Sequence, residues 1–276
     1  MLVTLKEILK IADEKKCAIG SFNTPNLESI MAVISAAEAL NQPVILMHAQ
    51  VHEEMGLCKM NEIAPIMLLM AEKASVPVCV HLDHGTDLSY VREGVELGFT
   101  SVMYDGSALP VDENYENTCR AVEMAGKYGA SVEAEVGSMG AREGGGEGGE
   151  SIYTDPDTAL WFVNGTGIDA LACAFGTAHG MYLTEPKLDF ERVSKINSLI
   201  DVPMVMHGGS GVSTEDYKEV IKRGIRKINY YTYMAKAAGE AISGKTYTQF
   251  HDAVNDAIAA MKNDVTKAIK TFSDIK

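Results

Sequence analysis

The fold of this 276-residue chain can be predicted outward from one segment, Val80-His81-Leu82-Asp83-His84-Gly85. It closes an apolar run, residues 76–82, which is typical of a buried strand. The run ends in two histidines around a carboxylate and then a glycine. Ionisable side chains at such a strand end can supply a metal ligand or a general acid, or they can form a turn that faces solvent.

Two more apolar runs end in the same way. Residues 170–175 lead into Gly176-Thr177-Ala178-His179-Gly180, and residues 202–206 lead into His207-Gly208-Gly209-Ser210-Gly211. Because the carboxyl ends of parallel strands meet at one side of a sheet or barrel, this recurrence favours one shared site over three unrelated turns.

Strands and helices alternate strictly along the chain. The expected strands are 18–22, 43–47, 77–82, 100–104, 131–136, 170–175, 203–206 and 226–230. The expected helices between and after them are 27–40, 62–74, 88–97, 112–128, 157–165, 190–200, 214–223 and 233–242. Eight strand–helix units, several of them with nearly continuous apolar strands, predict a (β/α)8 TIM barrel of class α/β rather than an open doubly wound sheet.

Two helices lie outside this alternation. Thr4 can cap an extra N-terminal helix, and residues 248–272 form an amphipathic C-terminal extension that either packs on the barrel or contacts another subunit. With no linker or internal repeat in view, the chain is expected to be a single domain, 1–276.

Composition limits the partners. A formal net charge of −14 argues against nucleic acid and against an anionic membrane surface, although a local site can still bind small phosphorylated substrates. No segment approaches the roughly 20 apolar residues of a membrane span. The five scattered cysteines and the lack of a signal-peptide pattern favour a cytoplasmic location.

Histidines at strand ends predict a metal site. His84, His179 and His207 follow three different expected strands, and three protein ligands with one open position are typical of catalytic zinc. Asp105 and Glu135 end two further strands and offer oxygen ligands for a second or alternative metal position.

Glycines after the last two expected strands predict a phosphate site. Barrels often bind phosphate with the loops after strands seven and eight, through backbone N–H groups and a helix N-terminus. Gly208, Gly209 and Ser210 follow the seventh expected strand, and residues 229–232 follow the eighth. Asp83 is placed to act as a general acid or base, or to orient a neighbouring histidine. The glycine-rich loop 137–150, with Arg142 and Glu143, is interpreted as a lid.

Taken in order, these motifs resemble the class II, metal-dependent ketose-bisphosphate aldolases. The resemblance runs from Ser21-Phe22-Asn23 to about Ala241. It rests on the three histidine motifs and on Tyr104-Asp105-Gly106-Ser107, Glu133-Ala134-Glu135-Val136-Gly137 and the segment that opens at Asn229.

The resemblance implies a barrel that assembles as a homodimer or homotetramer and cleaves a ketose 1,6-bisphosphate. It implies zinc on His84, His179 and His207, with Asp105 and Glu135 at the alternative metal position. Asp83 would exchange a proton with the aldehyde oxygen, and Glu143 would return one to the enediolate carbon. Contacts to dihydroxyacetone phosphate would come from Gly180, Gly208, Gly209, Ser210, Asn229, Tyr230, Tyr231 and Thr232. A monovalent cation, Na⁺ or K⁺, would bind near the phosphate.

One departure concerns the aldehyde half. Many fructose-bisphosphate members carry a small residue and an acid around Thr232, whereas this chain has Tyr230 and Tyr231 and no acid. Fructose 1,6-bisphosphate remains the first expectation, and tagatose 1,6-bisphosphate or another ketose phosphate is the alternative.

Three other functions stay open on the sequence. A metal-dependent hydrolase would use zinc to activate water, a Schiff-base aldolase would use Lys227, and a sugar-phosphate binding protein would have no chemistry. Chelator sensitivity and product identity separate these alternatives.

Overall fold

The computed structural model describes residues 1–138, 152–182 and 185–275. Within these residues, strands β2 to β9 form a closed parallel barrel, because each pairs with the next and β9 pairs back with β2. The barrel strands are β2 (Ile19–Asn23), β3 (Val44–Ala49), β4 (Val78–Gly85), β5 (Ser101–Tyr104), β6 (Ser131–Val136), β7 (Ala170–Cys173), β8 (Met204–Met206) and β9 (Ile225–Tyr230).

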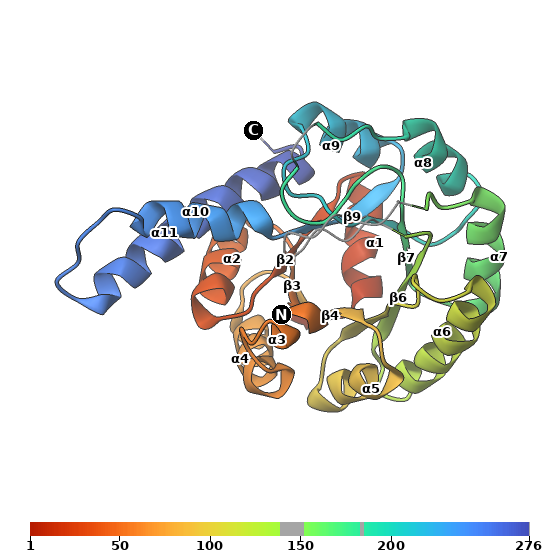
Figure 1. Cartoon of the computed structure of the whole chain (residues 1–276), viewed down its shortest axis with the longest axis horizontal. Coiled ribbons are helices and arrows are strands. Elements are labelled where there is room, and N and C mark those ends of the chain that lie inside the picture. Colours follow the sequence, from red (N-terminus) through yellow and green to blue (C-terminus); the bar gives the residue numbers. More distant parts are fainter. Residues whose placement is uncertain (139–151, 183–184, 276) are drawn as a thin grey trace.

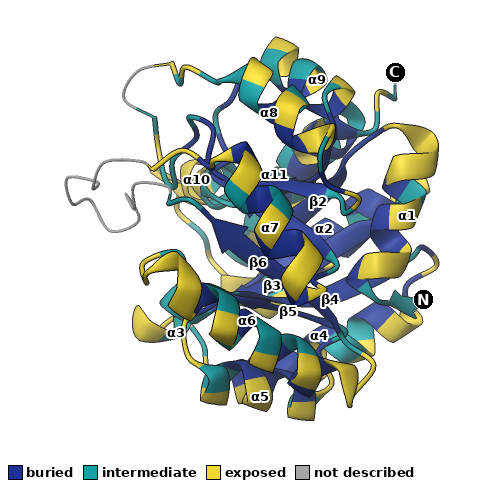
Figure 2. Ribbon diagram, turned by 90° about the vertical axis from the view of Figure 1, so that its right-hand side faces the viewer, coloured by how far each residue is buried: buried dark blue, intermediate teal, exposed yellow. Residues whose placement is uncertain are grey.

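Helices surround the strands on the outside (Figure 1). They are α2 (Leu27–Leu40), α4 (Met60–Lys73), α5 (Leu88–Leu97), α6 (Val111–Gly126), α7 (Pro156–Thr166), α8 (Phe190–Asn197), α9 (Thr214–Lys222) and α10 (Thr232–Ile242). Their outer faces are exposed while the strands are buried (Figure 2). The prediction of a (β/α)8 barrel with an N-terminal helix and a C-terminal helical extension is confirmed.

Helix α1 (Leu5–Lys15) covers the amino ends of the strands. Thr4 caps it as predicted, in a capping box with Glu7. Leu5, Ile8 and Leu9 are fully buried in a cluster that includes inward-facing strand residues. The interior of the barrel at this end is therefore an apolar layer.

Helix α11 (Phe250–Phe272) is the predicted extension. Its C-terminal half packs on the barrel through Met261, Val265, Ile269 and Phe272, while its N-terminal half pairs with α10. The two helices extend beyond the rest of the molecule at the left of Figure 1. Phe250, which the amphipathic pattern placed on the packed face, is 83% exposed at the start of this pair.

Two short elements were not predicted. Strand β1 (Leu2–Val3) adds to β4, and helix α3 (Gln50–Glu54) follows β3 directly at the carboxyl end of the barrel. Both are too short to show a periodic pattern. Among the helices of the described residues, none is long and apolar enough to cross a membrane.

Candidate metal and substrate site

A bulge in β4 brings two consecutive residues into the site. Along β4, Val80 and Leu82 point outward to the helices, while Cys79 packs inside the barrel. Strict alternation would turn His84 outward like Leu82. Instead the pairing with β5 shifts register between Leu82 and Gly85, and His84 takes a left-handed backbone with φ of 50°. Asp83 and His84 can therefore both serve the mouth of the barrel.

His84, His179 and His207 meet at this mouth as predicted. Each can offer a ring nitrogen such that the three nitrogens lie within 4.8 Å of one another. The ring centroid of His84 lies 4.9 Å from the ring centroid of His179 and 4.6 Å from that of His207. The three side chains come from β4, the segment after β7 and the end of β8, so only barrel closure brings them together.

Hydrogen bonds assign the tautomers of two of these histidines. His84 Nδ1 lies 2.6 Å from Asp105 Oδ2, and His207 Nε2 lies 2.8 Å from Glu133 Oε1. A carboxylate accepts, so each of these nitrogens donates. The two remaining ring nitrogens, His84 Nε2 and His207 Nδ1, face each other at 3.0 Å. At this distance either one nitrogen carries a proton and donates it to the other, or both rings are neutral and their two lone pairs can bind one metal ion.

Oxygen ligands lie next to the histidine cluster. His84, Asp105 and Glu135 form a second group whose ligand atoms also lie within 4.8 Å of one another. Glu135 Oε2 is 3.7 Å from His207 Nδ1. The two groups share His84, so they are adjacent positions rather than independent sites.

Asp83 is fixed by two amides. Asn23 donates to its Oδ2 at 3.2 Å and Asn229 to its Oδ1 at 3.1 Å. Burial alone would raise the pKa of Asp83, but positive charge at His84, His207 and Lys227 outweighs burial and holds that pKa below its usual range. The carboxylate is thus oriented and ionised at the wall of the cavity.

The predicted phosphate loop has the close approaches that require glycine. Gly208 has φ of 62°, and a Cβ there would collide with the Ala178 carbonyl oxygen. A Cβ on Gly209 would lie 2.6 Å from the Asn229 carbonyl oxygen. Ser210 accepts from the Tyr231 backbone N–H at 3.0 Å and so joins this loop to the start of α10.

One cavity joins these parts. It is lined by Asp83, by two members of the histidine group, His84 and His179, by the phosphate loop and by the segment after β9. The lining residues are Asn23, Ala49, His52, Asp83, His84, His179, Gly180, Gly208, Gly209, Ser210, Asn229, Tyr230, Tyr231 and Thr232.

Beneath the cavity lies a buried charged layer that the sequence did not reveal. Lys227 Nζ lies 2.9 Å from Glu133 Oε2 and 3.2 Å from Oε1, and both side chains are fully buried. Glu133 also accepts from His207. Glu133 precedes Glu135 by two residues and Lys227 precedes Asn229 by two, so each shares a strand face with a predicted site residue. That spacing was the signal that could have identified them.

The structure separates the two tyrosines. The Tyr230 ring packs outward, 5.9 Å from the Phe22 ring and 6.2 Å from that of Phe272, although the residue also borders the cavity. The Tyr231 ring lies over His52. Glu143, and with it most of the expected lid, lies outside the described residues.

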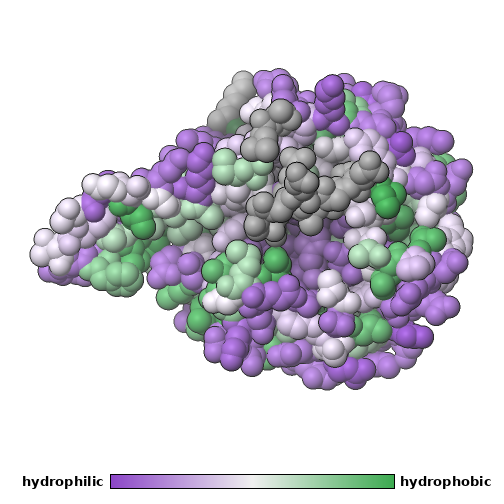
Figure 3. Space-filling view, in the orientation of Figure 1, coloured by the Kyte–Doolittle hydropathy of each residue, from purple (hydrophilic) through white to green (hydrophobic). Residues whose placement is uncertain are grey.

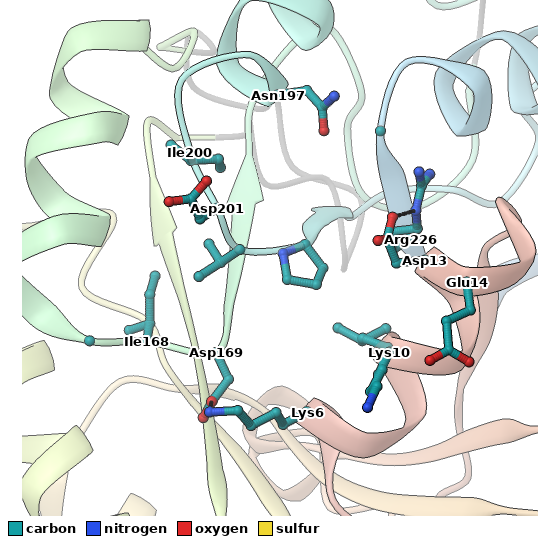
Figure 4. A pocket seen from close by; sticks show the side chains of 15 residues that line it. Lys6, Lys10, Asp13, Glu14, Ile168, Asp169, Asn197, Ile200, Asp201 and Arg226 are labelled. Atoms are coloured by element: carbon teal, nitrogen blue, oxygen red, sulfur yellow. Dashed lines mark hydrogen bonds and ion pairs between the residues drawn. The ribbon is translucent and has the colours of Figure 1, made fainter.

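A larger cavity, of about 690 Å³, lies at the opposite end of the barrel beside α1 (Figure 4). Four of its charged side chains form two pairs: Lys6 with Asp169 at 3.3 Å, and Arg226 with Asp13 at 3.0 Å. No grouping of metal-ligating residues was found there within the described part of the chain. The chemistry is therefore concentrated at the carboxyl ends of the strands.

The fold and the site define a (β/α)8 barrel enzyme with a three-histidine centre. The chain matches the family described as "Fructose-bisphosphate aldolase class-II" over residues 3–275. It is 41% identical over 250 residues to a Bacillus subtilis protein named "Probable fructose-bisphosphate aldolase", covering 88% of this chain and 87% of that protein.

Solved structures agree. The YdjI aldolase from Escherichia coli K12 superposes with a TM-score of 0.89 at 36% identity, covering 99% of this chain and 97% of the other. Fructose-bisphosphate aldolase from Campylobacter jejuni, at 22% identity and a TM-score of 0.80 over 98% and 95% of the two chains, shares the fold. The chain belongs to the class II fructose-bisphosphate aldolase family, and it is a carbon–carbon lyase.

Proposed function

We propose that this aldolase is zinc-dependent and cleaves a ketose 1-phosphate into dihydroxyacetone phosphate and an aldehyde. Fructose 1,6-bisphosphate, which would give glyceraldehyde 3-phosphate, is the first candidate, and tagatose 1,6-bisphosphate or another ketose phosphate is the alternative. The observation that carries the proposal is the histidine group, in which His84 Nε2 and His207 Nδ1 face each other at 3.0 Å, beside Asp83.

The donor set fits zinc. Tetrahedral Zn–N bonds of about 2.0–2.1 Å place two ligand nitrogens about 3.3 Å apart, close to the observed separation. His84, His179 and His207 would hold the ion, with Asp105 and Glu135 at the alternative position. When bound, the metal would stabilise negative charge on the oxygens of the enediolate.

The residues of this chain would orient the substrate and move its protons. The loop at Gly208–Ser210 and the first turn of α10 would hold the 1-phosphate through backbone N–H groups. Asp83 would take the proton of the C4 hydroxyl as the C3–C4 bond breaks, leaving the electron pair on C3. The same carboxylate would return that proton to the aldehyde oxygen in condensation.

The geometry disfavours two of the alternatives. Lys227 is fully buried and paired with Glu133 beneath the cavity, which argues against a Schiff base. A protein that only binds sugar phosphates would not need an ionised carboxylate such as Asp83, which two asparagines orient beside the histidine centre. The hydrolase alternative is weakened by the phosphate loop and by membership of a lyase family.

Glu143 is proposed to return a proton to C3 of the enediolate. Glu143→Ala should then lose most of its turnover and keep its metal, because Glu143 is not among the proposed ligands. Steady-state cleavage and metal content measure the two effects, and unchanged turnover would remove Glu143 from the mechanism.

We also propose a homodimer or homotetramer, a cytoplasmic location and a Na⁺ or K⁺ ion near the phosphate loop. A hydrophobic hollow of about 380 Å³ between α2, α10 and α11 supports assembly; its lining includes Met234, Ile242, Phe250 and Val254. Hydrophobic residues show on this helix pair at the left of Figure 3. Light scattering should give a mass of two or four chains, and a monomer at micromolar concentration would contradict assembly.

The proposal is tested by release of dihydroxyacetone phosphate from fructose 1,6-bisphosphate. Release should stop with a chelator and return with zinc, while inorganic phosphate stays absent. Tagatose 1,6-bisphosphate is the parallel substrate. Phosphate release would instead indicate a hydrolase, and chelator-resistant cleavage would indicate a Schiff base.

A further inference from the structure

His52 and Tyr231 form one wall of the cavity. Their ring centroids lie 4.6 Å apart with the planes tilted by 50°. His52 comes from α3 after β3, and Tyr231 comes from the junction of β9 and α10, so the contact spans the mouth between two separate elements. Both residues border the same cavity as Asp83.

The position of this wall relates it to the aldehyde half of the substrate. Asp83, which would act at C4, pairs in register with Ala49 on β3, and His52 follows Ala49 by three residues. The phosphate loop at Gly208–Ser210 follows β8, which lies opposite β4 in the barrel, whereas β3 is a neighbour of β4. A ketose phosphate held by that loop and cleaved beside Asp83 would direct its carbons beyond C4 toward His52 and the Tyr231 ring that contacts it.

The wall offers rings and hydrogen-bonding groups. Among the described residues that line the cavity, none is lysine or arginine. Lys227 lies beneath the cavity in its ion pair with Glu133. Burial lowers the pKa of His52, and the nearby charge of Asp83 opposes this only in part, so the imidazole is neutral near pH 7.

We propose that His52 and Tyr231 contact the aldehyde half of the substrate. With this wall the enzyme accepts aldehydes that have an uncharged, hydroxylated end as readily as phosphorylated aldehydes. This inference rests on the proposed function and narrows its substrate class. A phosphate at the far end of the ketose would gain little here, because the wall of His52 and Tyr231 presents two rings, with neither a cationic side chain nor a glycine-rich run of backbone N–H groups like the one at Gly208–Ser210.

The test is aldol condensation with dihydroxyacetone phosphate and either D-glyceraldehyde or D-glyceraldehyde 3-phosphate. The new bond joins C3 of the enediolate to the aldehyde carbon while the carbonyl electron pair moves to oxygen, and that oxygen takes a proton from Asp83, which first takes one up from water. We expect kcat/KM values for the two aldehydes within about tenfold of each other, a small difference in transition-state binding. A buried ion pair to the phosphate would instead give a preference of at least about 100-fold.

Variants of His52 and Tyr231 test whether these two residues set the preference between the two aldehydes. Tyr231→Ala and His52→Ala should each lower kcat/KM for condensation with D-glyceraldehyde, because ring contacts to the aldehyde are lost. This loss should be about tenfold larger than the loss in the rate of solvent-deuterium exchange into dihydroxyacetone phosphate, which needs no aldehyde. Tyr231→Phe should recover most of this loss. Tyr231→Arg should shift the ratio toward the phosphorylated aldehyde by about tenfold, because guanidinium binds phosphate. Tyr128→Ala, at a half-exposed tyrosine after α6, is the matched control.

Deuterium exchange separates the two proposals. Lack of exchange in the zinc-loaded enzyme would sink the proposed function itself. Normal exchange with a preference of about 100-fold or more for the phosphorylated aldehyde, or with no use of D-glyceraldehyde, would overturn the inference alone. Equal losses in exchange and condensation for Tyr231→Ala would also overturn it.

Discussion

Asp83→Asn should lower kcat for ketose phosphate cleavage by about 10²–10⁴-fold, the usual contribution of a positioned general base. The substitution keeps the size of the side chain and removes its ability to take the C4 proton. Asp83 accepts from Asn23 and Asn229 and is not one of the grouped metal ligands. Zinc content should therefore stay close to that of the unmodified enzyme.

Asp87→Asn is the control for this substitution. Asp87 is exposed, four residues further along the chain, and makes no side-chain cap to α5. It should leave kcat within about twofold, as expected for a surface substitution away from the site. A metal-loaded Asp83→Asn enzyme with undiminished kcat would remove Asp83 from proton transfer.

Lys227→Met should lower the free energy of unfolding by about 3–5 kcal/mol, because it leaves Glu133 charged and unpaired in the barrel interior. Burial alone would raise the pKa of Glu133, but the charge of Lys227, the hydrogen bond from His207 and the charges of His81 and His207 together outweigh burial and lower the pKa to about 2. Loss of the lysine therefore leaves either a buried charge or a protonated acid. Denaturant unfolding of the metal-free protein measures the effect.

The same substitution should weaken zinc binding by about 10–100-fold, the usual effect of a residue that orients a metal ligand. Glu133 holds the Nε2–H tautomer of His207 that leaves Nδ1 facing His84. In the double variant Lys227→Met with Glu133→Gln, stability should recover in part, since no charge remains buried. Lys222→Met on exposed α9 is the control. Unchanged stability and zinc affinity in Lys227→Met would contradict the positioning role.

The sequence predicted the barrel and its three histidines because both depend on short-range patterns. Apolar strands alternate with amphipathic helices, and a polar residue follows each relevant strand. His84 is different in kind. Its approach to the site depends on a bulge and a left-handed backbone, which neither hydrophobic periodicity nor residue type predicts.

Other residues were missed for a physical reason. His52 lies on a five-residue helix, too short for a periodic signal, and its proximity to Tyr231 is created by barrel closure. Tyr230 could have been placed better, since alternation from inward-facing Asn229 predicts an outward ring.

The most direct test of the central claim is solvent-deuterium exchange into C3 of dihydroxyacetone phosphate, followed by proton NMR. It needs no assumption about the aldehyde. The account predicts that one C3 proton exchanges in the zinc-loaded enzyme, that a chelator stops the exchange, and that His207→Ala abolishes it together with zinc binding. Exchange that continues in the chelated protein, or none in the zinc-loaded protein, would contradict a metal-dependent aldolase built on His84, His179 and His207.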